Sequence, residues 1–175
     1  MNNALCKTKE LKKTWIRLFV IYTVIMAVTG AVVFYPFLDA HASLVWNPDG
    51  MTQHYTAFVY FGNYLRDIIK NLFAGHLIIP QYDLSIGLGS DILQALHYYV
   101  IGDPLNLVSV LIPEKYAAIG YSLLIIFRYY LAGLAFCMLT RYKKLPIHSS
   151  VAGSVIYAFT AYTMSMALRH QSFLN

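Results

Sequence analysis

The run Leu18–Leu38, LFVIYTVIMAVTGAVVFYPFL, decides the fold, because its 21 residues carry no charge. About 20 apolar residues in a helix cross the hydrocarbon core of a bilayer, so this run predicts a first transmembrane helix at 18–38. A signal peptide is the alternative, since Ala40-His41-Ala42 resembles a cleavage site. The apolar region of a signal peptide spans about 7–15 residues, and the longer run favours an uncleaved membrane helix.

The composition of the whole chain agrees with a membrane protein. Hydrophobic residues make up 58% of the 175 residues and charged residues 12%, whereas a soluble domain carries about 25% charged residues. This composition excludes intrinsic disorder and argues against an ordinary soluble enzyme. The two cysteines, Cys6 and Cys137, form neither a disulfide framework nor a CxxC motif.

Two further apolar runs predict two further transmembrane helices. The run 117–140 is interrupted by Arg128, and the run 149–168 is rich in small residues, which suits close helix packing in lipid. We therefore predict an all-α polytopic membrane protein with three transmembrane helices and a long external segment between the first and second of them.

The charge pattern predicts the orientation of these helices. Lysine and arginine cluster in the N-terminal segment 1–17 and in the loop 141–148, whereas 39–116 has an excess of acidic residues. Basic segments stay in the cytoplasm, so 39–116 and the end at 169–175 are predicted to be external. The net charge of +5 is thereby explained by topology, and nucleic-acid binding is not expected.

The external segment is predicted to contain helices of its own. Apolar residues recur at helical spacing in 51–74, with polar residues on the other side, which predicts an amphipathic helix on the outer membrane surface. The apolar stretch 93–112 is broken by Gly102-Asp103-Pro104, so a partial, re-entrant or surface helix pair is expected. Because the chain stops soon after the third run, a truncated end is also expected.

Asp49 is the first candidate for a catalytic group. It lies shortly after the first span and before the amphipathic helix, where a carboxylate can accept a proton from a sugar hydroxyl as a general base. The alternative is an N-cap, in which the side chain only satisfies backbone N–H groups. Gln53 and His54 follow one helical turn later and are either polyol ligands or a surface polar pair.

Three other aspartates are candidates for substrate binding. Asp83 and Asp91 flank a glycine-containing stretch that predicts a tight turn or a backbone nest for a lipid-linked phosphate. That stretch matches neither nucleotide-binding fingerprint. Asp103 precedes a proline and is a turn residue, a second carboxylate near Asp49 or a metal ligand.

Basic residues in or beside the spans complete the candidate set. Arg128 lies near the middle of the second span, where a charge needs a partner or a polar cavity; it forms a structural ion pair or binds phosphate. Arg169 and His170 end the third span and either anchor it at the interface or face the external site. No metal motif is present, so a bound metal is unsupported, and no cofactor is predicted.

Several strings coincide along the chain. They are Ser43-Leu44-Val45-Trp46-Asn47-Pro48-Asp49-Gly50, Gln53-His54-Tyr55, Tyr60-Phe61-Gly62-Asn63-Tyr64-Leu65-Arg66, Tyr82-Asp83-Leu84-Ser85-Ile86-Gly87-Leu88-Gly89-Ser90-Asp91, Tyr98-Tyr99-Val100-Ile101-Gly102-Asp103-Pro104-Leu105-Asn106, Arg128-Tyr129-Tyr130-Leu131-Ala132-Gly133-Leu134-Ala135-Phe136, and Arg169-His170 with Phe173-Leu174-Asn175. Together, from about residue 15 onward, they resemble the N-terminal part of the bacterial YfhO-type membrane proteins.

The resemblance implies a multi-pass protein of the bacterial cytoplasmic membrane, related to the GT-C class of glycosyltransferases. Such enzymes transfer a sugar from a polyprenyl-phosphate carrier outside the membrane; here the implied acceptor is a cell-envelope polymer such as teichoic or lipoteichoic acid. Asp49 matches the position of their catalytic carboxylate, and Arg128 or Arg66 would stabilise the departing phosphate. Members of the family are several times longer, so this chain is expected to be an N-terminal part.

Two other interpretations remain open from the sequence. The chain is a non-enzymatic membrane protein, either a transporter component or an assembly partner, or it is an inactive fragment. Under the enzymatic interpretation, its partners are the carrier-linked sugar, the polymer acceptor and the lipid bilayer. A separate enzyme that loads the lipid carrier is a further partner to consider.

Overall fold

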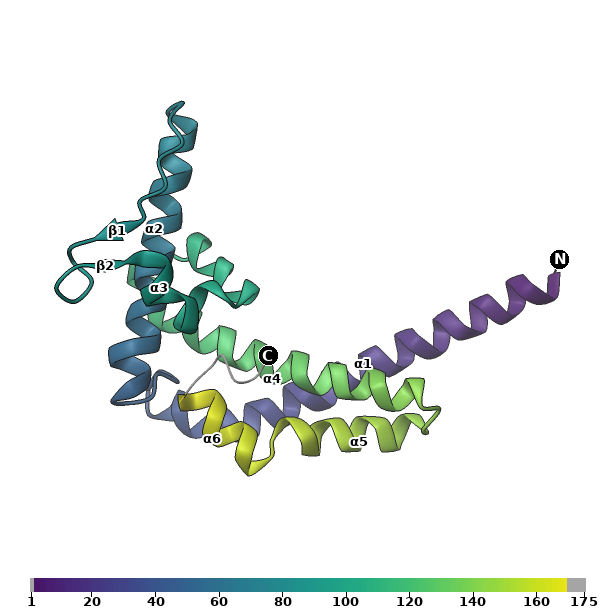
Figure 1. Cartoon of the computed structure of the whole chain (residues 1–175). Helices are drawn as coiled ribbons and strands as arrows, with labels where there is room; N and C mark the ends of the chain where they lie inside the picture. Colours follow the sequence, from purple (N-terminus) through teal and green to yellow (C-terminus); the bar gives the residue numbers. More distant parts are fainter. Residues whose placement is uncertain (1, 170–175) are drawn as a thin grey trace. The chain divides into compact units, whose positions relative to one another are not determined.

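The computed structural model describes the backbone of residues 2–169 and the side chains of residues 13–165. Figure 1 labels the α-helices and the strands. In the text, η1 and η2 are π-helical turns, and η3 and η4 are 3-10 helices. The elements are α1 (Asn2–Asp39), η1 (Gly50–Tyr55), α2 (Thr56–Phe73), β1 (Tyr82–Asp83), β2 (Ser90–Asp91), α3 (Ile92–Leu96), η2 (His97–Ile101), η3 (Pro104–Leu111), η4 (Glu114–Tyr116), α4 (Ala117–Tyr142), α5 (Ile147–Ala158) and α6 (Ala161–Arg169).

The described chain divides into two units. Of the described residues, the first unit contains 2–42 and 126–163, and the second contains 43–125 and 164–169. The long helix α4 begins in the second unit and ends in the first.

The first unit is held together by apolar side chains from three helices. In Figure 1, α5 runs beside α1, and the two helices are in contact. Their shared core also includes one residue of α4, and its buried members are Leu18, Tyr22, Met26, Cys137, Val151 and Ala158. Leu18, Tyr22 and Met26 recur every four residues, so one face of α1 is buried.

Small residues let the helices of this unit approach closely. A Cβ atom added to Gly133 would lie 2.6 Å from the Tyr22 hydroxyl and 3.3 Å from the Ser154 carbonyl oxygen. The Tyr22 hydroxyl donates a hydrogen bond of 2.5 Å to the Tyr130 carbonyl. Close backbone approach through small residues is the packing mode expected for helices in lipid.

Within the described residues, two helical segments are long and apolar enough to cross a membrane, Lys13–Asp39 and Glu114–Tyr142. They contain the runs 18–38 and 117–140 for which spans were expected. Several valines of α1, including Val28 and Val32, are exposed, as suits a surface that faces lipid. An all-α membrane protein is thereby supported, while the third crossing and the re-entrant helices stay predictions.

The run 149–168 is not one helix in the structure. The first of its two pieces, α5, ends at Ala158, and α6 begins at Ala161. The Thr160 hydroxyl accepts a hydrogen bond from the Thr163 backbone N–H, which is how an N-cap threonine starts a helix. Phe159 stacks on Tyr129, with ring centroids 5.5 Å apart. These local contacts explain the break between α5 and α6, which no glycine or proline in the sequence predicts.

The second unit is built on α2. Its apolar residues Phe58 and Phe61 are buried, and Tyr121 of α4 packs edge-on against Phe58 at 5.5 Å. On another side, α2 is in contact with η3. A Cβ atom at Gly62 would lie 2.8 Å from the Ser109 carbonyl oxygen, so glycine is the residue that permits this approach.

The segment after α2 forms a short hairpin and then the four short helical elements α3, η2, η3 and η4. Strands β1 and β2 pair antiparallel, with Tyr82 opposite Asp91 and Asp83 opposite Ser90. The turn between them contains Gly87 and Gly89 at positive φ values of 62° and 105°, where residues with a Cβ atom are strained. The helical stretch that follows is interrupted at Gly102-Asp103, before η3 begins at Pro104.

Candidate functional site

Asp49 is an exposed residue at the start of the second unit's first helical turn. It occupies the N-cap position of η1 with helical backbone angles, and its side chain makes no capping hydrogen bond. The peptide bond Asn47-Pro48 just before it is cis. The capping role that the sequence left open for Asp49 is therefore not used here, and the carboxylate faces solvent.

Gln53 and His54 lie on η1 and meet the side chains of η2. The Tyr99 hydroxyl donates a hydrogen bond of 3.2 Å to Gln53 Oε1. The His54 ring is fully buried and packs edge-on against the Tyr99 ring, with a centroid distance of 5.2 Å. Of the expected polar pair, Gln53 is thus exposed and His54 is buried, and Tyr99 contacts both of them.

Asp83 belongs to a second polar group in the same unit. The Tyr60 hydroxyl of α2 donates a hydrogen bond of 2.5 Å to Asp83 Oδ2, and the Ser85 backbone N–H donates one of 2.7 Å to Oδ1. These two hydrogen bonds lower the pKa of Asp83, and the bond from Tyr60 has the larger effect. Burial, and then the bond to Asp83, raises the pKa of Tyr60.

Two of the aspartates expected to bind substrate cap helices in the structure, and their part in substrate binding stays a prediction. Asp91 Oδ1 accepts a hydrogen bond of 2.8 Å from the Gln94 N–H at the start of α3. Asp103 is buried, and its Oδ1 accepts one of 2.9 Å from the Leu105 N–H at the start of η3. Both side chains satisfy helix amides that would otherwise lack partners.

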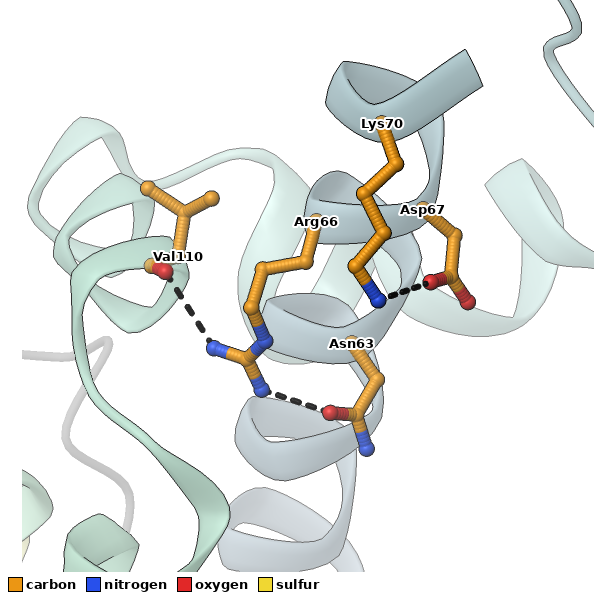
Figure 2. A network of polar contacts seen from close by, with 5 residues as sticks. All are labelled: Asn63, Arg66, Asp67, Lys70 and Val110. Atoms are coloured by element: carbon orange, nitrogen blue, oxygen red, sulfur yellow. Dashed lines mark hydrogen bonds and ion pairs between the residues drawn. The ribbon is translucent and has the colours of Figure 1, made fainter. Parts of the chain in front are cut away.

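Arg66 directs its guanidinium at the end of η3, as Figure 2 shows for the contact with Val110. Its Nη1 donates to the carbonyl oxygens of Ser109, Val110 and Ile112 at 2.9, 3.2 and 2.8 Å. Its Nη2 donates to Asn63 Oδ1 at 2.5 Å. The last carbonyls of a helix need such donors, so this arrangement gives Arg66 a role in holding η3 against α2.

Arg128 lies in α4, within the first unit, and only 2% of its surface is exposed. A buried charge in an apolar helix needs polar surroundings, and its part in phosphate binding stays a prediction. Arg169 is the last residue of α6, and the structure describes its backbone position alone. His170, the other residue expected at that end, lies outside the described residues.

No cluster of three or more histidine, cysteine, aspartate or glutamate side chains that could hold a metal ion occurs among the described residues.

A comparison with protein families adds to this geometry. Residues 17–171 match the model of the family described as bacterial membrane protein YfhO. The chain belongs to the YfhO family. The resemblance drawn from the sequence strings is thereby confirmed, and the two apolar helices fit a YfhO membrane protein. No curated protein and no solved structure matches the chain.

Tyr60 and Tyr99 are the site residues that sequence reasoning did not single out in this YfhO protein. The sequence has 15 tyrosines, and an excess of aromatic residues is usual at membrane interfaces. The partners Asp83 and Gln53 lie 23 and 46 residues away in the chain. No local pattern marks such pairs, because they depend on how η2 and the hairpin fold back onto η1 and α2.

The bond between Tyr60 and Asp83 predicts a pH dependence. A carboxyl whose pKa falls on folding stabilises the fold above its unfolded value of about 3.9, and this contribution is lost as the pH falls through the lower folded value. A tyrosine whose pKa rises on folding contributes below about pH 10 and loses this contribution at higher pH. The link between α2 and the hairpin is therefore expected to hold from about pH 4 to pH 10.

The variant Tyr60→Phe tests this assignment. It is expected to raise the pKa of Asp83 toward its ordinary value, because the first cause of the shift is removed. Carbon-13 NMR of the Asp83 carboxyl in detergent micelles measures the titration. Tyr64→Phe is the matched control, since the Tyr64 hydroxyl donates to the Pro80 carbonyl. An equal rise in both variants would contradict the role of Tyr60.

Proposed function

We propose that this chain is part of a membrane glycosyltransferase that moves a sugar from a polyprenyl-phosphate carrier to a cell-envelope polymer. Teichoic and lipoteichoic acids are the acceptors that we favour, and the external face of the cytoplasmic membrane is the place. Membership of the YfhO family and the GT-C-like position of Asp49 support this proposal. Segment 39–116 is then external, and the N-terminus is cytoplasmic.

The observation that carries the proposal is the state of the Asp49 carboxylate. It is exposed and does not cap η1, whereas Asp83, Asp91 and Asp103 accept hydrogen bonds from the protein itself. A carboxylate that does not cap a helix remains able to accept a proton from a bound hydroxyl group.

In the proposed reaction, Asp49 accepts the proton of the acceptor hydroxyl as that oxygen attacks the anomeric carbon of the sugar. The bond between the anomeric carbon and the phosphate oxygen breaks, and its electron pair leaves with the polyprenyl phosphate. Gln53 and Tyr99, already joined by a hydrogen bond, offer an amide and a hydroxyl that orient the acceptor. A separate enzyme would supply the loaded carrier.

Carrier turnover tests the proposal. Membranes containing the full-length protein and a polyprenyl-phosphate-linked radiolabelled sugar are expected to release free carrier phosphate and to label the envelope polymer. Membranes from cells lacking the gene are the control. If both release carrier at the same rate, the enzymatic proposal fails, and a transporter component or assembly partner becomes the better explanation. The buried Arg128 would then serve a path or a helix contact.

A further inference from the structure

A cavity lies between α1 and α5 in the first unit, and residues of these two helices alone line it. Its volume is about 650 Å³, within the range of about 300–1,000 Å³ that is usual for small-molecule sites. Its walls are aliphatic, with Ile21 and Ile25 on one side and Val155 and Ile156 on the other. Ile25 and Ile156 are exposed, so the cavity is an open groove.

One end of this groove is polar and cationic. Figure 1 shows α1 and α5 running side by side in the same direction along the chain. Arg17 is the first lining residue of α1, and His148 lines the groove from the first turn of α5. Both residues therefore lie at the same end. From Arg17 to Ile25 the lining face of α1 extends about 12 Å, at 1.5 Å per residue.

The charges around this end favour an anionic group. Arg17 is exposed and makes no ion pair with any described residue. Lys13 precedes it by one helical turn on α1 and is also exposed. The acidic residue of this unit whose side chain is described, Asp39, is 22 residues further along α1, about 33 Å away. The N-terminal end of α5 adds a partial positive charge.

We propose that this groove binds a membrane phospholipid with an anionic headgroup. One acyl chain would lie between α1 and α5, against Ile21, Ile25, Val155 and Ile156. The headgroup phosphate would meet the Arg17 guanidinium, whose fork matches phosphate oxygens, and a ring N–H of His148. Basic pockets between membrane helices bind anionic lipid headgroups in this way. The inference is independent of the proposed glycosyl transfer, because it rests on the first unit alone.

Lipid titration of the purified full-length protein in detergent tests the proposal. Phosphatidylglycerol and phosphatidylcholine with the same acyl chains are added, and the rise in melting temperature gives an apparent Kd for each. Phosphatidylglycerol is expected to stabilise the protein at lower concentration. Arg17→Gln is expected to weaken phosphatidylglycerol binding about fivefold, the effect of one basic residue at an anionic surface.

Two further variants separate this groove from general basic charge. Lys143→Gln removes the same charge from an exposed residue that does not line the groove, and its Kd is expected to stay within twofold of wild type. Ala152→Phe places a large side chain in the groove from an exposed lining residue. It is expected to abolish the preference for phosphatidylglycerol over phosphatidylcholine. Each variant is first melted without lipid, which detects any loss of fold.

Three results would overturn the proposal. Equal binding of both phospholipids would show that the headgroup makes no specific contact. Equal losses of affinity in Arg17→Gln and Lys143→Gln would show that a diffuse basic surface, and not the groove, binds the lipid. Polyprenyl phosphate that displaces phosphatidylglycerol at a lower concentration would make the carrier the occupant. A carrier that competes no better than phosphatidylglycerol supports the phospholipid.

Discussion

Replacing Asp49 by asparagine is expected to lower sugar transfer by a factor of about 10²–10⁴, the usual contribution of a general base. Asparagine keeps the shape of the side chain, but its amide cannot take a proton from the acceptor hydroxyl. The fold should tolerate the change, because Asp49 is exposed and makes no capping bond. The loss is measured as the rate of polymer labelling from the carrier-linked sugar.

The matched control for this prediction is Asp67→Asn. Asp67 is also an exposed aspartate of the second unit, and its ion pair with Lys70 at 3.1 Å (Figure 2) lies on the surface. Exposed pairs of this kind contribute about 0–1 kcal/mol, so activity and protein level should stay near wild type. Wild-type labelling by Asp49→Asn, at equal protein level in the membrane, would remove Asp49 from the mechanism.

Truncating Arg66 to alanine is expected to destabilise the second unit by about 2–4 kcal/mol. The change leaves three carbonyl oxygens at the end of η3 without the guanidinium, and an unsatisfied buried acceptor costs about 1–3 kcal/mol. Water reaches this half-buried site and offsets part of that cost. Denaturant unfolding in detergent, followed by a probe placed in the second unit, measures the difference.

Two variants sharpen the Arg66 prediction. Lys70→Ala removes a cation one turn further along α2 and is expected to cost no more than about 1 kcal/mol. Arg66→Lys keeps the charge but not the planar fork that reaches several acceptors, so it should recover only part of the stability. Unchanged unfolding of Arg66→Ala would contradict its role in holding η3, and weaker binding of the carrier in the same variant would support the substrate-binding role expected from the sequence.

The helices were predictable where the sequence pattern is long and regular. The uncharged run 18–38 lies within α1, and the apolar periodicity of 51–74 is found in η1 and α2. The glycine, aspartate and proline at 102–104 mark the interruption before η3. In each case the signal is local, because helix geometry repeats every few residues.

The roles of the candidate site residues were less predictable. The sequence predicts that Asp103 binds substrate and that Arg66 binds phosphate, and nothing in the structure tests either role. The structure adds contacts that the sequence did not indicate: Asp103 caps η3, and Arg66 donates hydrogen bonds to the last carbonyls of η3. Tyr60 and Asp83 meet because the hairpin returns to α2. Such pairings are fixed by tertiary folding, which one sequence without local markers does not reveal.

The break between α5 and α6 has a consequence for the depth of the bilayer. The 12 residues of α5 rise about 18 Å, short of the roughly 30 Å of hydrocarbon. A crossing made here would need both helices, with the irregular backbone of Phe159 and Thr160 below the lipid surface. Irregular backbone at that depth persists only where protein or water covers it. A crossing at α5 and α6 therefore requires a hydrated or protein-lined recess within the membrane.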